Sequence, residues 1–362
     1  MSKDLLFIGV LPTPVHGASQ INRLAVDHLK TLKYDVSELD TYSLTRSLSR
    51  FPIPQMVTRA FRCLSILIYL LSNYKTLPKI WYISLSGGGG LIFDLIYAIC
   101  GKALGASMIM HHHSYAYLNN YSILFFLITK ISGVPSNQHI FLSPKMKTLA
   151  LKKYPNLAGC TNTAVSNVGL LFGFLQQNSK STRLTEKSSL TIGYLANITK
   201  EKGAHDFLDL AGTFRNDTRN INFIMAGPCE DLALLERIEI EKKRSTVFNY
   251  IGSVYGQDKA DFFSEVDLFV FPSRYRNEAE PLVLIEAGYY GCEILSTDIG
   301  SISEMASFLN LSIVSAESNL KSEVEKFLHK TPSFMNKNPE TNLKKKSIND
   351  LKLFEGLFEE LI

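Results

Sequence analysis

The chain has 362 residues with a hydrophobic content of 46%, which is enough for two domains with packed cores. Its five cysteines are scattered and form no C-x-x-C pair, so the pattern excludes a disulfide framework and fits a reducing cytoplasm. No apolar run reaches the length of a membrane span; the nearest are Leu64–Leu71, Leu91–Cys100 and Ile123–Ile128. The first residues lack a signal-peptide pattern, so we expect a cytoplasmic protein.

The net charge of +4 conceals opposite charges on the two halves of the chain. Residues 1–185 hold 18 Lys and Arg against 6 Asp and Glu, a balance of +12, whereas residues 186–362 hold 20 against 28, a balance of −8. Between Thr41 and Thr185 the only acidic residue is Asp94. We therefore expect the first half to contact an anionic membrane surface, the inner face of the plasma membrane, and steering of a small anionic substrate is the alternative. No motif points to nucleic acid as a partner.

Strand and helix patterns alternate along the chain, which predicts an α/β protein with parallel sheets. In the first half the expected strands are Leu5–Leu11, Lys79–Leu85, Ser107–His112 and Ile140–Leu142, and the expected helices are Gln20–Lys30, Leu91–Leu104 and Pro144–Lys153. Residues 1–170 are thus predicted to form one domain. The polar stretch Gln176–Thr182 marks a linker, which we place at residues 171–188.

The same alternation restarts after the linker. The expected strands there are Ser189–Leu195, Asn222–Ala226, Val247–Ile251, Asp267–Phe271 and Glu293–Thr297. Residues 189–346 are predicted to form the second domain, and residues 347–362 an amphipathic helix that packs on the body of the protein. Two such sheets would leave a cleft, with ligand-binding loops at the carboxyl ends of the strands.

A basic segment interrupts the first domain. Its basic residues, interleaved with apolar ones, are Arg46, Arg50, Arg59 and Arg62. Such a segment suits an anionic lipid leaflet. A solvated arm that covers the first domain is the alternative.

The stretch 267–286 predicts a buried strand, a loop that carries a carboxylate, and a helix. Glu278 lies in the loop, and Glu286 lies eight residues further on, about two turns into the helix. The free N–H groups and the positive end of the helix dipole form a site for an anion such as a phosphate. The helix is expected to begin at Pro281, followed by Leu282 and Val283, which supply those N–H groups.

Several segments together resemble family 4 retaining glycosyltransferases, which have a GT-B fold. The spacing of Glu278 and Glu286 resembles the E-x7-E signature of that family. Further matching segments are 193–203, 224–228, 250–254 and 296–304, together with Gly9–Gly17 and the strand end His111–His113. The resemblance covers nearly the whole chain, and it is specific in the second domain and loose in the first. It implies two Rossmann-like domains that face each other across a cleft.

The resemblance implies a role for each matching residue. Glu278 would hold hydroxyls of the donor sugar, Glu286 would hold the ribose, and Lys202 would stabilise the departing diphosphate. His113 would stand beside the donor sugar, and Gly17 would let the backbone approach a phosphate closely. The alternatives are a solvated lysine, carboxylates that only complement a helix dipole, and a buried structural histidine.

The chain departs from the family at one donor-binding position. The family usually has an arginine five residues before the lysine, where this chain has Asn197, which donates a neutral hydrogen bond but carries no charge. Lys200 is the candidate to compensate. Val254 lies in the segment that resembles the one meeting the nucleotide base.

Other chemistries fit the sequence less well. A zinc site at His111–His113 lacks a third ligand nearby in sequence. The run Gly87–Gly90 is followed by no Gly-Lys-Ser/Thr and matches no dinucleotide fingerprint. No G-x-S-x-G elbow or D-x-D motif is present. We therefore expect neither a metal nor a cofactor.

The sequence predicts a retaining, metal-independent glycosyltransferase. It would move a sugar from a nucleotide-diphosphate donor to a hydroxyl of a glycan or lipid-linked glycan, as in polysaccharide, O-antigen or capsule assembly. One alternative is a GT-B nucleotide-sugar epimerase. The other is a non-catalytic subunit that binds nucleotide sugars in a glycan assembly complex.

Overall fold

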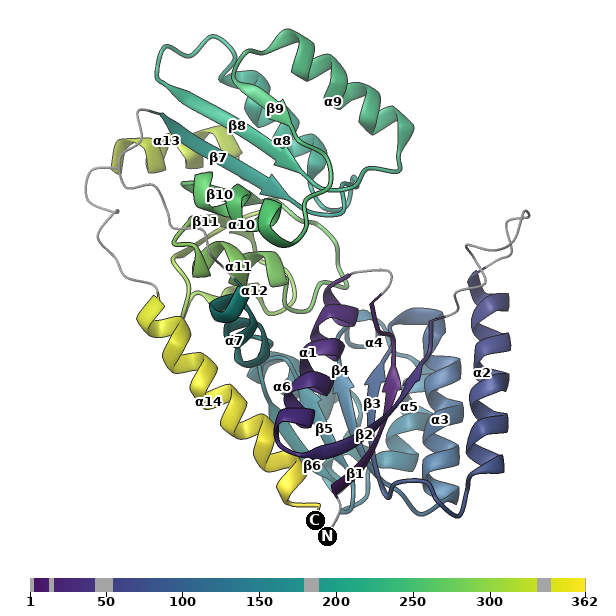
Figure 1. Ribbon diagram of the computed structural model, residues 1–362. Helices are drawn as coiled ribbons and strands as arrows, with labels where there is room; N and C mark the ends of the chain where they lie inside the picture. Colours follow the sequence, from purple (N-terminus) through teal and green to yellow (C-terminus); the bar gives the residue numbers. More distant parts are fainter. Residues whose placement is uncertain (1–2, 13–15, 43–54, 179–188, 331–339, 362) are drawn as a thin grey trace. The chain divides into compact units, whose positions relative to one another are not determined.

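The computed structural model divides the chain into two compact units, shown in Figure 1. The first unit is Met1–Leu171 with Ile348–Ile362, and the second is Phe172–Ser347. The residues that the structure describes are 3–12, 16–42, 55–178, 189–330 and 340–361. Each unit is built around a parallel six-stranded sheet with helices on its faces, which is a Rossmann-like arrangement.

The sheet of the first unit has the strand order β2-β1-β3-β4-β5-β6. Its strands are β1 (Lys3–Gly9), β2 (Tyr34–Asp40), β3 (Ile80–Leu85), β4 (Ser107–His112), β5 (Gln138–Phe141) and β6 (Thr161–Ala164). The central strands are buried on both faces, which explains their nearly continuous apolar sequences. All pairings are parallel, so the carboxyl ends of these strands share one edge.

Helices cover both faces of this first sheet. They are α1 (Gly17–Thr31), α2 (Gln55–Ser72), α3 (Leu91–Ala103), α4 (Ala116–Asn119), α5 (Ile123–Ser132), α6 (Pro144–Lys153) and the end of α14 (Glu340–Glu359), whereas α7 (Val168–Asn178) crosses from the first unit into the second. Neighbouring residues of β3 point to opposite faces: Trp81 packs toward α3, and Tyr82 contacts Phe354 of α14. The layer of α2, α3 and α5 is seen to one side of the sheet in Figure 1.

The second unit repeats the plan with the strand order β12-β11-β10-β7-β8-β9. Its strands are β7 (Leu190–Leu195), β8 (Ile221–Ala226), β9 (Phe248–Tyr250), β10 (Leu268–Phe271), β11 (Glu293–Thr297) and β12 (Leu311–Val314). Its helices are α8 (Ala204–Thr213), α9 (Leu232–Arg244), α10 (Gly256–Glu265), α11 (Leu282–Tyr289), α12 (Ile302–Met305) and α13 (Leu320–Lys330). These strands also pair in parallel.

The predicted α/β class with parallel sheets is confirmed. The bounds of β4, α6 and β11 agree with the sequence expectation to the residue. Elements that the sequence analysis did not identify include β2, α2, α5, β6 and β12. Residues 171–178 lie in α7, so the first part of the predicted linker is helical, and residues 179–188 lie outside the described residues.

The C-terminal helix is longer than expected. α14 begins at Glu340, before the predicted start at residue 347. Its final turns pack in the first unit, where Phe358 contacts Tyr34 and Glu355 lies 2.8 Å from His28. In the part of the chain that the structure describes, no helix is long and apolar enough to cross a bilayer.

Candidate functional site

The donor-site candidates of the second unit lie in loops at one edge of its sheet. Because the strands are parallel, the loops that follow β7, β9 and β10 leave from the same, carboxyl edge. The loop after β7 holds Asn197, Lys200 and Lys202, the loop after β9 holds Val254, and the segment after β10 holds Glu278 and Pro281, followed by Leu282, Val283 and Glu286 in α11. The structure thus gathers all of these predicted residues at one edge.

Glycine brings the loop of Lys202 against the loop that follows β10. Gly203 has φ of 79°, and a Cβ at this position would lie 2.2 Å from the carbonyl oxygen of Pro272. The contact is reinforced by the Arg274 amide, which donates to the Glu201 carbonyl at 2.7 Å. The two loops are therefore fixed against each other on either side of the lysine.

Lys202 and Glu278 form an ion pair across these loops. The Lys202 ammonium donates to Oε2 of Glu278, and the side chains are 22% and 12% exposed. The same ammonium lies 4.9 Å from the centre of the Tyr275 ring. The pair is accessible enough to meet a ligand, and its cation is held in place by a carboxylate and an aromatic face.

A second glycine supports the carboxylate of this pair. Gly300 has φ of 61°, and a Cβ there would lie 2.0 Å from the carbonyl oxygen of Glu278. The next residue, Ser301, donates its amide to the Ala279 carbonyl at 3.0 Å. The segment after β11 thereby braces the backbone at Glu278, which fits the match of residues 296–304 noted in the sequence.

The second signature carboxylate, Glu286, pairs with a lysine that the sequence analysis missed. Lys259 of α10 places its ammonium 2.6 Å from Oε1 and 2.6 Å from Oε2 of Glu286. Only the contact with Oε1 has hydrogen-bond geometry, so Oε2 accepts no hydrogen bond from the described residues. The Glu286 side chain is 4% exposed. The site therefore keeps one buried carboxylate oxygen, Oε2 of Glu286, that can accept a hydrogen bond from a ligand.

The start of α11 corrects the sequence prediction. Pro281 has φ of −66° and ψ of 118° and is the N-cap, so the helix begins one residue later, at Leu282. Glu286 lies just over one turn into the helix, whereas the two turns expected from the sequence were counted from Glu278, which precedes the helix. Leu282 and Val283 are the first two helical residues, whose N–H groups have no acceptor within an α-helix.

The remaining donor candidates are less enclosed. Asn197 and Lys200 are exposed in the loop after β7, and Val254 is half-buried in the loop between β9 and α10. Gly227 has φ of 125°, and its Cβ would lie 1.8 Å from the carbonyl oxygen of Ala196, so the strand ends of β7 and β8 approach closely there. The structure places Asn197 beside this junction but shows no partner that replaces the missing arginine charge among the described residues.

In the first unit, His113 and Gly17 lie at the carboxyl edge of the sheet. His113 follows β4 directly, and Gly17 is the first residue of α1, where it is exposed. Nε2 of His113 is buried and has no hydrogen-bond partner among the described residues. Burial, with a smaller contribution from the charge of His16, lowers the pKa of His113 to about 3. At neutral pH, His113 is therefore a neutral imidazole whose Nε2 makes no hydrogen bond with the described residues.

His16, which the sequence analysis did not single out, caps α1 and lies near His113. Its Nδ1 accepts from the Ser19 amide at 3.3 Å, and the Ser19 hydroxyl completes a capping box. Residues 13–15, within the segment Gly9–Gly17, lie outside the described residues.

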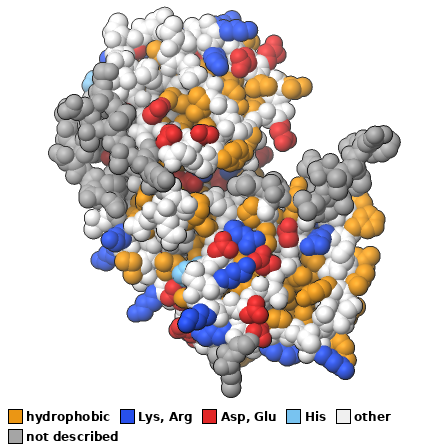
Figure 2. Space-filling model, viewed as in Figure 1, with side chains coloured by type: hydrophobic (Ala, Val, Ile, Leu, Met, Phe, Trp, Pro, Cys, Tyr) orange, Lys and Arg blue, Asp and Glu red, His pale blue; other side chains and the backbone are white. Residues whose placement is uncertain are grey.

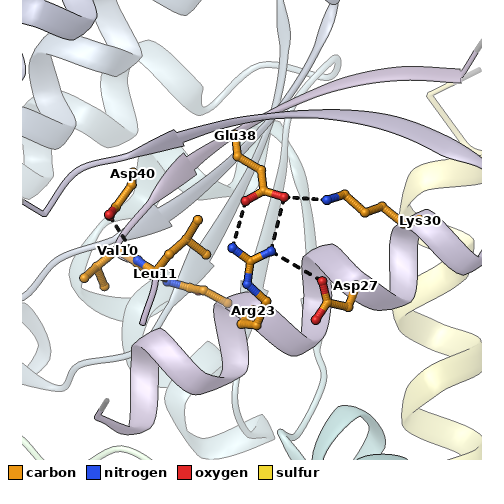
Figure 3. A network of polar contacts seen from close by, with 8 residues as sticks. Val10, Leu11, Arg23, Asp27, Lys30, Glu38 and Asp40 are labelled. Carbon is orange, nitrogen blue, oxygen red and sulfur yellow. Dashed lines mark hydrogen bonds and ion pairs between the residues drawn. The ribbon is translucent and has the colours of Figure 1, made fainter. Parts of the chain in front are cut away.

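Polar contacts fix the elements around that segment, as Figure 3 shows. Asp40, at the end of β2, accepts from the Leu11 amide at 3.1 Å. Glu38 accepts from Arg23 at 2.8 Å and from Lys30 at 2.6 Å, which ties β2 to α1. The middle and the last turn of α1 are thus tied to β2, and the segment after β1 is tied to the end of β2.

The other two histidines of the triplet belong to the packing of the sheet. His111 is hydrogen-bonded to Tyr82 at 2.6 Å, and its ring lies 4.1 Å from that of His113, so these two share a face. His112 points to the opposite face and bonds Tyr117 and His139. Among the described residues there is no group of three metal-binding side chains, so the zinc alternative gains no support.

Comparisons with known proteins bear on the family and the fold. Residues 176–345 match the family model of glycosyl transferases, group 1. No curated protein matches the sequence. Among solved structures, sucrose-phosphate synthase from Thermosynechococcus elongatus is 13% identical with a TM-score of 0.70, covering 99% of this chain and 100% of the other.

Two further structures are similar over nearly the full length. HepE from Anabaena in complex with UDP-glucose is 12% identical, with a TM-score of 0.68 and coverage of 99% of this chain and 100% of that one. The lipopolysaccharide outer core galactosyltransferase WaaB, in its apo form, is 13% identical, with a TM-score of 0.62 and coverage of 97% and 95%. At these identities the likeness establishes the GT-B fold.

Proposed function

We propose a reaction for this chain, which is a glycosyltransferase of group 1 with a GT-B fold. It transfers a sugar from a nucleoside-diphosphate donor to an acceptor hydroxyl, with retention of the anomeric configuration and without a metal ion. The observation that carries the proposal is the pair of signature carboxylates, Glu278 and Glu286, each held by a lysine at the carboxyl edge of the second sheet.

The ion pairs suit the charges that the reaction creates. Cleavage of the donor builds negative charge on the departing diphosphate, and a fixed ammonium stabilises that charge as it grows. Lys202 is the proposed ammonium, assisted by the N–H groups of Leu282 and Val283. Glu278, on the other side of the pair, accepts hydrogen bonds from the sugar hydroxyls.

A UDP-sugar is the proposed donor class. HepE, one of the similar structures, was solved with UDP-glucose. The buried Oε2 of Glu286, which faces the Lys259 ammonium, accepts no hydrogen bond from the residues that the structure describes, and this fits a ribose hydroxyl. Val254, in the loop after β9, is proposed to meet the base.

The first unit is proposed to bind the acceptor, and His113 and Gly17 to approach the donor sugar and phosphate. A neutral His113 donates or accepts a hydrogen bond without adding charge near the reacting carbon. Attack from the front face is proposed, in which the acceptor oxygen bonds the anomeric carbon, the sugar–phosphate bond breaks, and the leaving phosphate takes the acceptor proton. Trapping of a glycosyl-enzyme would contradict this route.

A glycan or lipid-linked glycan in surface-polysaccharide assembly is the proposed acceptor. The support is the likeness to WaaB and the basic first half of the chain, which also favours an anionic membrane surface, the inner face of the plasma membrane, as a partner. A different acceptor would leave the proposed donor chemistry unchanged.

Thermal shift with UDP-, GDP-, ADP- and dTDP-sugars tests the donor proposal. We expect a selective rise in melting temperature with UDP-sugars, lost in Glu286→Ala. Asn222→Ala, a change on β8 outside the candidate site, is the matched control and should keep the rise. Turnover of a nucleotide sugar without any acceptor would indicate an epimerase instead. Binding without hydrolysis or transfer would indicate a non-catalytic subunit, the alternative that Asn197 favours.

A further inference from the structure

The outer face of α2 is an apolar stripe exposed to solvent. Its residues recur every three or four positions and so lie on one side of the helix: Val57, Phe61, Leu64, Ile68 and Leu71, with exposed fractions of 41% to 68%. The opposite side packs inward through Cys63, Ile66 and Leu70, which are at most 3% exposed. A surface helix of a water-soluble domain normally carries polar residues on its outer side.

The helical layer that carries the α2 stripe has positive charge and no exposed negative charge among residues 55–178. There the only acidic side chain is Asp94, and it is 3% exposed. Exposed lysines lie near the C-terminal ends of its helices: Lys75 and Lys79 follow α2, Lys102 is in the last turn of α3, and Lys130 is in the last turn of α5. Figure 2 shows hydrophobic side chains gathered on the flank of the unit, with Lys and Arg around them.

Further apolar side chains extend the stripe onto the same helical layer. Ile92 and Ile99 of α3 and Ile123 and Leu127 of α5 are exposed. Apolar surface of this extent on a single face marks an interaction site rather than scattered exposed residues.

We propose that α2 lies in the plane of an anionic phospholipid leaflet and inserts its apolar stripe. This inference rests on the proposed function, which includes a membrane partner. It adds that α2 is the helix that binds the membrane. The combination of an apolar face, flanking lysines and a lack of acidic residues is what binding to such a leaflet requires. A second copy of this chain is a poorer occupant because two such faces would bring like charges together.

The orientation of α2 brings the acceptor edge to the bilayer. Arg62, near the start of α2, donates to the Asp40 carbonyl at 2.6 Å, and Arg59 donates to the Ser86 hydroxyl at 3.0 Å. Asp40 ends β2 and Ser86 follows β3, so the first half of α2 lies beside the carboxyl edge where His113 is found. A docked α2 therefore holds this edge at the level of lipid head groups, where a lipid-linked acceptor would present its sugar.

Flotation of the full chain with vesicles tests the docking. Wild-type protein should float with vesicles of phosphatidylglycerol and phosphatidylcholine and not with phosphatidylcholine alone. The combined change Phe61→Gln, Leu64→Gln and Ile68→Gln should weaken partitioning at least about tenfold, because three apolar side chains no longer enter the leaflet. Leu232→Gln, at a still more exposed position of the second unit, is the control and should leave partitioning unchanged.

A fluorescent reporter locates the inserted face. The single native tryptophan, Trp81, is fully buried. Phe61→Trp should therefore give a new emission that shifts to the blue with anionic vesicles and is quenched by brominated lipid, whereas Leu232→Trp should not respond. Equal flotation of the triple variant and the wild type would overturn the proposal. A dimer in sedimentation that the triple variant disperses, without vesicle binding by the wild type, would also overturn it.

The shift in melting temperature with a UDP-sugar distinguishes failure of this inference from failure of the proposed transfer. The triple variant should keep the shift in melting temperature with a UDP-sugar, because α2 lies outside the second unit. Loss of vesicle binding with the donor shift retained supports docking through α2. Absence of the donor shift in wild type, with flotation intact, would instead count against the proposed transfer while leaving the docking standing.

Discussion

Each signature carboxylate is held by a lysine from a different element. Glu278 pairs with Lys202, which the sequence analysis named, and Glu286 pairs with Lys259, which it did not. Lys259 lies 27 positions before its partner on a helix whose residues are mostly exposed. A pair between two separate helices has no characteristic spacing in a single sequence. The two carboxylates, in contrast, lie within one strand–loop–helix segment, so their spacing could be recognised from the sequence.

Removal of the Lys259 charge should destabilise the folded protein, because Glu286 loses its ion-pair partner. Lys259→Met leaves a buried carboxylate without its cation, and we expect a loss of about 1–3 kcal/mol in the free energy of unfolding. The double variant Lys259→Met, Glu286→Gln should recover much of that loss, because the remaining amide is neutral. Urea unfolding of wild type, Lys259→Met, Glu286→Gln and the double variant measures the coupling free energy between the two side chains. Equal stability of Lys259→Met and wild type would show that the pair is not energetically coupled.

The buried His113 predicts a loss of stability in acid. Its pKa is lowered to about 3 by burial, from 6.5, so the unfolded chain binds a proton that the folded chain refuses. This contribution is complete above pH 6.5 and is lost as the pH falls toward 3, by at most about 1.4 kcal/mol per pH unit.

His113→Asn tests that contribution. Urea unfolding at pH 7.5, 6 and 4.5 should show that wild type loses more stability than the variant over this interval. The charge of His113 also contributes to lowering the pKa of His111, whose ring lies 4.1 Å away, so the comparison reports the two histidines together. Parallel curves for the two proteins would contradict the lowered pKa.

At the scale of elements, the sequence predicted the buried strands and missed three strands at sheet edges, β2, β6 and β12. β4 and β11 are almost entirely buried runs and were located well. β2 has the sequence Tyr-Asp-Val-Ser-Glu-Leu-Asp and lies at the sheet edge, where only Tyr34 and Val36 are buried. Its charged residues make it resemble a loop when tertiary contacts are unknown.

The helix α2 was missed for a related reason. The run Leu64–Leu71 was noted only as too short to span a membrane. Arg59 and Arg62 were assigned to a basic segment and residues 64–71 to a separate apolar run, so the two were not joined into one helix. Arg46 and Arg50, in the basic segment that precedes it, lie outside the described residues.

The last turns of α14 should be essential to the first unit. Phe358 is fully buried and contacts Tyr34 and Tyr82. Phe358→Ala should cost about 3–5 kcal/mol, since the vacated space lies between a helix and the sheet. Leu353→Ala, at an exposed position of the same helix, should change stability by less than about 0.5 kcal/mol. Thermal unfolding by circular dichroism compares them, and equal melting of the two variants would contradict the assigned packing.

At the scale of the whole molecule, the chain consists of two units with separate cores. The repetition of one α/β pattern predicted this class, and the family resemblance supplied the GT-B identification that the similar structures support. The sequence alone did not show that the first half gathers many exposed apolar residues on α2, α3 and α5, because burial depends on contacts between distant segments.

Separate cores predict two unfolding transitions in calorimetry. Phe358→Ala should lower the transition of the first unit and leave that of the second unit nearly in place. Phe207→Ala, in the buried face of α8, should do the reverse. A single transition that moves equally with either change would show that the two units unfold cooperatively.

The path of α14 sets a rule for exchanging parts between related enzymes. The chain leaves the first unit at Leu171 and returns to it at Ile348. A chimera cut only near residue 171 would pair a foreign first half with a terminal helix shaped for Tyr34 and Tyr82. The first unit is therefore a discontinuous module: residues 1–171 and 348–362 must travel together, and the second unit is in effect an insertion between them.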